Sequence, residues 1–207
     1  MKQLMTLFIL LSVCSSGFAA TSVSALQKDW AITNYKLQGD EQVQSFEQLI
    51  ETAASAVAME PSNAELLIWK AIIESTYAGK ASSLTALRLV KAARADLEAA
   101  MDIDPMALDG SAYTSLGALY YQVPSWPLAF GSSKKARKLL EKAIEVNPDG
   151  IDSNYFYGAF LVEEKDYDSA RQALKKALQA PARPGRELAD SGRRAEITEL
   201  LSQLDES

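Results

Sequence analysis

The sequence predicts an all-α protein, in which antiparallel helix pairs stack as an irregular solenoid that a C-terminal helix caps. Three observations predict this class: an internal repeat of helix ends, helices rich in aromatic residues between those ends, and one further amphipathic segment after the last repeat. The repeat is informative because one helix pair cannot bury its apolar face alone, whereas stacked pairs share a continuous core.

The repeated helix ends lie at 97–105, 140–148 and 174–181, with a weaker copy at 53–61. Each is an apolar segment of helical periodicity that a proline closes, because proline cannot continue a helix. Three of these helices carry two alanines seven residues apart: Ala93 and Ala100, Ala136 and Ala143, and Ala170 and Ala177. Residues seven apart lie on one helix face, so we expect a neighbouring helix to approach closely there.

The segments 112–121 and 155–161 are the expected partner helices, and each carries a glycine near its middle, Gly117 and Gly158. Glycine in a helix interior costs about 1 kcal/mol relative to alanine. We therefore expect a packing reason, namely a helix crossing at which a side chain would be in the way.

The segment 187–204 follows a break at 182–186 that contains proline and glycine. It reads as one more amphipathic helix, whose apolar side carries Leu188, Ile197, Leu200, Leu201 and Leu204. Because a terminal repeat needs a cap with a polar outer face, we interpret residues 182–207 as a capping helix after a repeat domain at 20–181.

Taken together, the repeated residues resemble the tetratricopeptide repeat (TPR) family, whose units place Gly, an aromatic or large apolar residue, two alanines and a proline at fixed spacing. The resemblance covers roughly residues 28–181 and comprises four units. The first two units match the family at Tyr35, Gly39, Ala56 and Pro61, and at Ala71, Ala93, Leu97, Ala100 and Pro105. The last two match it at Gly117, Tyr120, Ala136, Leu140, Ala143 and Pro148, and at Gly158, Leu161, Ala170, Leu174 and Ala177. The units are longer than the family's 34 residues. The resemblance therefore implies an irregular TPR-like solenoid.

The resemblance also implies that the first helix of each pair lines a concave groove. Carried over residue by residue, the groove positions are Ile68, Ile72 and Thr76, then Thr114, Ala118 and Tyr121, then Tyr155, Ala159 and Val162. We expect this surface to be apolar and aromatic with few charges, and it lacks the lysines and asparagines with which the family binds acidic C-terminal tails. Such a groove suits an amphipathic helix, an extended segment or an apolar small molecule.

The connection 122–133 is a second candidate site, because two prolines and a glycine prevent a helix there and loops on a rigid scaffold often carry function. Trp126 and Phe130 would be anchors for a partner if they are exposed. The alternative is that both fold back and fill the gap that this long connection leaves.

One basic cluster stands near the C-terminus, formed by Arg183, Arg186, Arg193 and Arg194. It could hold an acidic partner or an anionic lipid surface. Acidic residues lie among these arginines, so we favour the interpretation that the cluster is a solvated face.

The first 19 residues have the order of a secretory signal peptide: a positive start at Lys2, a short apolar run and small residues before a cut after Ala19. This predicts a periplasmic protein. The alternative is lipid anchoring at Cys14, where the bulky Val13 departs from the usual small residue.

Catalysis has few candidates in this chain, which contains no histidine and a single cysteine, Cys14. A His-based triad is therefore excluded, no Gly-rich phosphate loop is present, and we expect no enzyme activity, no cofactor and no bound metal. Without Lys2 the chain carries 20 basic against 27 acidic residues, a net charge of −7. This balance argues against nucleic-acid binding.

Two hypotheses of function follow. The first is a scaffold that binds another envelope protein or a peptide segment through its groove and the Trp126 loop. The second is a small-molecule-binding accessory of a transport system, because the segments 126–131, 147–156 and 183–186 look like exported TPR proteins grouped with the T-component of TRAP transporters. That resemblance implies a pore that accommodates a ligand, an association with a substrate-binding protein, and self-assembly into a homo-oligomer.

Overall fold

The computed structural model describes residues 21–206, and the expected signal peptide, its cut after Ala19 and Cys14 lie outside them. The described residues form helices and no strand, which confirms the all-α class. In chain order the helices are α1 (Val23–Tyr35), α2 (Gly39–Met59), α3 (Ala64–Ala78), α4 (Ser83–Ile103), α5 (Ala107–Gln122), α6 (Ser133–Val146), α7 (Ile151–Glu163), α8 (Tyr167–Leu178) and α9 (Glu187–Asp205).

The expected helix ends are confirmed at all four prolines of the repeat. Helices α2, α4, α6 and α8 end two or three residues before Pro61, Pro105, Pro148 and Pro181. Several of the following helices begin at a polar cap: the Asn63 side chain accepts from the first turn of α3, and Asp166 accepts from Ser169 N at the start of α8. Such caps satisfy amide groups that have no partner within the helix.

The close helix crossings expected from small residues are also confirmed. A Cβ added at Gly117 would lie 2.7 Å from Cγ of Leu140, and one at Gly158 would lie 2.8 Å from Cγ of Leu174. Each glycine therefore lets the second helix of its pair approach without a clash. The six alanines spaced seven apart, from Ala93 to Ala177, are all buried.

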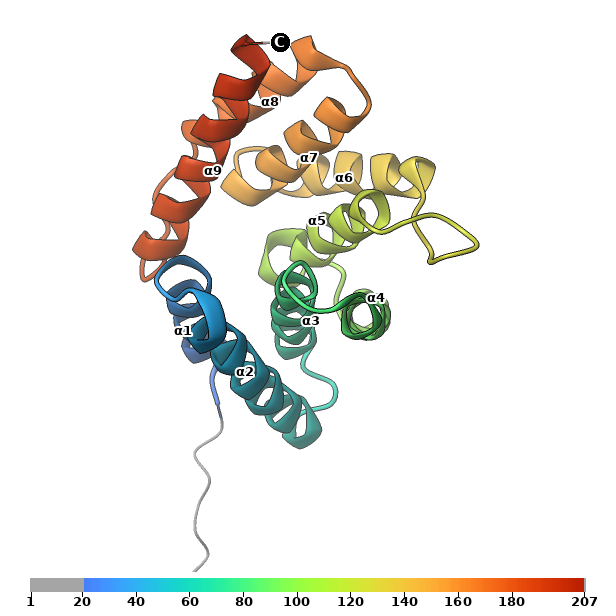
Figure 1. The fold of residues 1–207 in the computed structure, drawn as a ribbon, viewed down its shortest axis with the longest axis vertical. Helices are drawn as coiled ribbons and strands as arrows, with labels where there is room; N and C mark the ends of the chain where they lie inside the picture. Colours follow the sequence, from blue (N-terminus) through green and yellow to red (C-terminus); the bar gives the residue numbers. More distant parts are fainter. Residues whose placement is uncertain (1–20, 207) are drawn as a thin grey trace, which may run out of the picture.

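The helices form two layers around a ring (Figure 1). Helices α1, α3, α5 and α7 form the inner layer, each in contact with the next, and α2, α4, α6 and α8 pack outside them. Helix α9 contacts α7 and α8, as a capping helix should, but it also contacts α1. Together with α9, the four inner helices therefore close a ring.

The closure rests on a close approach between α1 and α9. Tyr35 lies so near the backbone of Gly192 that an added Cβ would sit 2.3 Å from the tyrosine ring. Tyr35 also meets the edge of Trp30, with ring centroids 5.7 Å apart. The two ends of the described chain are thus held together by packed side chains.

Helix α5 begins with a left-handed turn at Leu108, Asp109 and Gly110, whose φ angles are 50°, 55° and 71°. Only after this turn does the helix that was expected from residue 112 run regularly.

No helix of residues 21–206 is long and apolar enough to cross a membrane.

Candidate functional site

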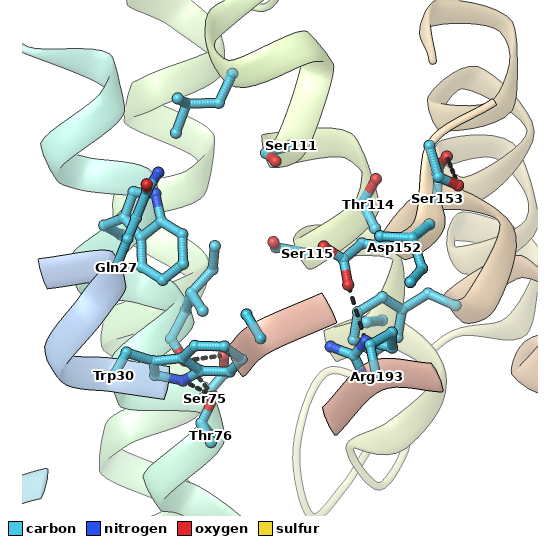
Figure 2. Close-up of a pocket in the computed structure, with 18 of the residues that line it drawn as sticks. Gln27, Trp30, Ser75, Thr76, Ser111, Thr114, Ser115, Asp152, Ser153 and Arg193 are labelled. Atoms are coloured by element: carbon cyan, nitrogen blue, oxygen red, sulfur yellow. Dashed lines mark hydrogen bonds and ion pairs between the residues drawn. The ribbon is translucent and has the colours of Figure 1, made fainter. Parts of the chain in front are cut away.

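The centre of the ring holds a cavity of about 270 Å³. Its wall is built from residues of α1, α3, α5, α7 and α9 and of the linkers beside α7 and α9. Figure 2 shows Gln27 and Trp30 on one side, Asp152 and Arg193 on the other, and the hydroxyl groups of α5 between them. The inner ring therefore places side chains from both ends of the chain around one space.

The predicted groove positions separate into two groups. Ile72, Thr76, Thr114 and Ala118 line the cavity. The others lie outside its wall: Ile68 is 0 % exposed in the core, and Tyr121, Tyr155, Ala159 and Val162 are half-buried. The groove is thus only partly assembled as the family positions implied.

One wall of the cavity is aromatic. Trp30 and Trp69 meet edge to face with ring centroids 5.8 Å apart, and the Trp30 Nε1 donates to Thr76 Oγ1 at 3.0 Å. Phe156 of α7 also lines the cavity. These rings offer apolar surface to a ligand body.

Hydroxyl groups and charges interrupt the apolar wall. The hydroxyls belong to Tyr35, Ser75, Thr76, Ser111, Thr114, Ser115 and Ser153. Three arginines and two aspartates also line the cavity: Arg183, Arg186, Arg193, Asp109 and Asp152. The expectation of a surface with few charges is therefore wrong for the cavity, because the arginines come from α9 and its linker, which the groove positions of the repeat do not include.

Asp152 at the start of α7 joins two of these arginines. Its Oδ2 accepts from Arg183 Nη1 at 2.7 Å, and its Oδ1 accepts from Arg193 Nε at 2.8 Å. The buried Asp190 binds Arg183 as well, at 2.6 Å. Arg183, Arg193 and Arg194 of the basic cluster therefore form an ion-pair network that ties α9 to α7, and the interpretation of the cluster as a solvated face is wrong.

The network sets the charge state of its members. Burial opposes ionisation of Asp152, but the guanidinium groups of Arg193 and Arg183 outweigh it and lower the pKa of Asp152 to about 2. Arg193 also lies over the rings of Tyr155 and Phe156, 4.3 Å and 4.8 Å from their centroids. This stacking gives the half-buried Tyr155 a role in holding Arg193.

Arg186 differs from the other arginines of the described chain near α9. Its guanidinium lies 4.9 Å from the centroid of the Trp69 ring and takes part in no ion pair or side-chain hydrogen bond that the described residues form. Both Arg186 Nε and Trp69 Nε1 are buried without a hydrogen-bond partner. Burial, and then the positive charge of Arg183, lower the pKa of Arg186.

In the second candidate site, the Trp126 loop (residues 122–133), one aromatic residue is exposed and the other folds back onto the helices. Trp126 is 84 % exposed and Leu128 74 % exposed, whereas Phe130 folds back onto the ring of Tyr120 with centroids 5.6 Å apart. The base of the loop is fixed, since Gly131 N donates to Pro124 O at 2.9 Å. The loop therefore presents Trp126 to solvent from a defined position.

Sequence reasoning missed Trp30, Trp69 and the role of Arg186. The first repeat unit is the most divergent, so α1 gave no groove positions, and the arginines lie beyond the repeats. The alternation of arginine and acidic residues at 183–196 was the available signal. Among residues 21–206, no group of His, Cys, Asp and Glu is arranged to hold a metal ion.

The paired helices that stack around a central cavity define a helical repeat protein. Residues 128–186 match the tetratricopeptide repeat family, a segment that spans α6, α7 and α8. This segment is therefore similar to the tetratricopeptide repeat, a helical repeat that generally serves as a scaffold for protein interaction.

Two solved structures of the protein MamA are similar to this chain. One shares 20 % identity, with 82 % of this chain and 95 % of that chain covered and a TM-score of 0.46. The other shares 19 % identity, covers 89 % and 91 %, and has a TM-score of 0.45. No protein with a curated description matches the chain.

Proposed function

We propose that this protein is an exported scaffold that binds a partner protein of the cell envelope through the Trp126 loop. The observation that carries the proposal is the exposure of Trp126 and Leu128 together on a loop whose base is fixed. Exposed aromatic and aliphatic side chains on a rigid support are typical anchors of protein interfaces. A fixed loop also loses little conformational entropy when a partner binds.

The groove has a different role in this proposal from the one the family positions implied. Four groove residues line the central cavity of about 270 Å³ inside a ring of helices. An α-helix with its side chains has a diameter of about 10–12 Å, which needs an open groove. We therefore assign protein binding to the Trp126 loop and small-molecule binding to the cavity.

Site-specific photocrosslinking in intact cells tests the loop. A photoreactive residue is placed at Trp126 and, as the matched control, at Leu84 on α4, which is 82 % exposed. We expect a discrete adduct with one other protein at Trp126 and none at Leu84. Equal labelling at both positions would contradict the proposal, and an adduct between two copies of this chain would assign the loop to self-assembly.

Small-molecule binding is a second candidate function, and the cavity with its aromatic wall and unpaired buried donors favours it. It accords with the resemblance to TRAP T-component-like proteins. The test is native mass spectrometry of the mature protein purified from its own envelope. A bound mass that is released on denaturation supports this function, and a bare protein mass argues against it.

The export step is proposed from the order of charged, apolar and small residues before Ala20. Mass spectrometry of the intact protein from fractionated cells distinguishes the two forms of export. We expect a periplasmic chain that begins at Ala20. A membrane-bound chain that begins at an acylated Cys14 would establish the lipoprotein alternative instead.

A further inference from the structure

One arginine of the cavity wall forms no ion pair. Of the three arginines of the wall, Arg183 is paired with Asp152 and the buried Asp190, and Arg193 with Asp152 and Glu196. Asp152 is held by both Arg183 and Arg193, so its carboxylate is fully engaged. Arg186 is therefore the arginine of the wall that forms no ion pair with a carboxylate of the described residues.

The surroundings of Arg186 raise the free energy of the empty site. Two donors side by side, Arg186 Nε and Trp69 Nε1, are buried without acceptors. A buried donor without a partner costs about 1–3 kcal/mol, and more when it belongs to a charged group. The lowered pKa of Arg186 has the same origin in burial and in repulsion from Arg183. An anion at this position would relieve both effects.

We propose that the central cavity binds a small organic monocarboxylate, with its carboxylate on Arg186 and its apolar part against Trp30, Trp69 and Phe156. This inference rests on the small-molecule function proposed above and names its ligand class. A guanidinium matches the two oxygens of a carboxylate, and one arginine without an ion pair matches a monoanion. The cavity volume is close to the lower end of ligand pockets, about 300 Å³, which excludes a long acyl chain.

The tryptophans provide a direct measurement of occupancy. The chain contains three, of which Trp30 and Trp69 line the cavity and Trp126 lies on the exposed loop. Fluorescence of the mature Trp126→Phe chain therefore reports on the cavity alone. The probes are 3-phenylpropionate, its uncharged amide, and inorganic phosphate. We expect a saturable change with the acid, binding of the amide that is at least about tenfold weaker, and no effect of phosphate.

Substitutions test whether Arg186 binds the carboxylate of the ligand. Arg186→Gln should weaken binding of the acid about tenfold and leave binding of the amide unchanged, and Arg186→Lys should restore part of the loss. Arg88→Gln on the exposed part of α4 makes the same change in net charge away from the cavity and should leave both affinities unchanged. Circular dichroism confirms that each variant is folded before titration.

The outcomes separate the inference from the function on which it rests. Equal binding of acid and amide would overturn carboxylate recognition and leave small-molecule binding in place. Binding of phosphate alone would assign Arg186 to phosphoryl anions and also overturn the inference. No saturable response to any probe would overturn it as well, and native mass spectrometry of the purified protein would then decide small-molecule binding independently.

Discussion

Asp152 connects residues that come from three parts of the chain, and it does so with one side chain. It stands in the first turn of α7 and accepts from Arg183 in the linker and from Arg193 in α9. Removing one partner of such a network leaves the remaining charges without compensation. The carboxylate therefore stabilises the position of α9 more than its own burial would indicate.

We predict that Asp152→Asn destabilises the protein by about 2 kcal/mol, less than for a fully buried pair because the side chain is partly exposed. The pKa of Asp152 is lowered from 3.8 to about 2 in the folded state, so its contribution is fully present above pH 4 and is lost as the pH falls towards 2. Urea unfolding of both proteins between pH 2 and pH 7 measures this. A difference that stays constant down to pH 2 would contradict the assigned pKa.

Two tryptophans should differ sharply in their effect on stability. Trp30→Ala is expected to cost about 3–5 kcal/mol, because the side chain is buried, meets Trp69 and donates to Thr76. Trp126→Ala should leave the melting temperature unchanged, since its side chain is exposed. Thermal unfolding followed by circular dichroism gives both values. A large loss at Trp126 would show that the loop supports the fold.

At the scale of helices, Gly158 and Leu174 show how a pair is fixed. The space for a side chain at Gly158 is occupied by Leu174, and the same holds for Gly117 and Leu140. We predict that Gly158→Val destabilises the protein by about 3 kcal/mol through overpacking. Glu163→Val, at an exposed position of the same helix, controls for helix propensity and should change stability by under about 1 kcal/mol. Similar losses in chemical unfolding for both variants would show that the crossing is not tight.

These helix pairs were predictable because their determinants are local. A proline ends its own helix, and an alanine or glycine face acts on the helix that follows in sequence. The contact of α9 with α1 was not predictable, because Tyr35 and Gly192 lie at opposite ends of the chain and carry no repeat signal. The same holds for the candidate site. Ile72 and Thr114 were predictable from their positions in the repeat, whereas the contact between Trp69 and Arg186 was not, because it forms only when the ring closes.

At the scale of the whole molecule, the ring makes the cavity depend on a contact between the two ends. An open solenoid would expose the aromatic wall of α1 and α3 on a concave face. Here α9 lies beside α1, and the linker before it places Arg186 over Trp69. Ligand affinity and ring closure should therefore be coupled, since residues of both α1 and α9 line the cavity.

Gly192→Ala tests this coupling, because the added Cβ would lie 2.3 Å from the ring of Tyr35 and would force α1 and α9 apart. Ser191→Ala, at an exposed position beside it, is the control. We expect faster hydrogen exchange in α1 and in the first turns of α9, unchanged exchange in α4 and α6, and weaker binding of 3-phenylpropionate. Faster exchange in every helix would mean that the ring unfolds as one unit. Unchanged exchange in α1 would show that the contact does not hold the ring closed, and α9 would then act only as a cap on α7 and α8.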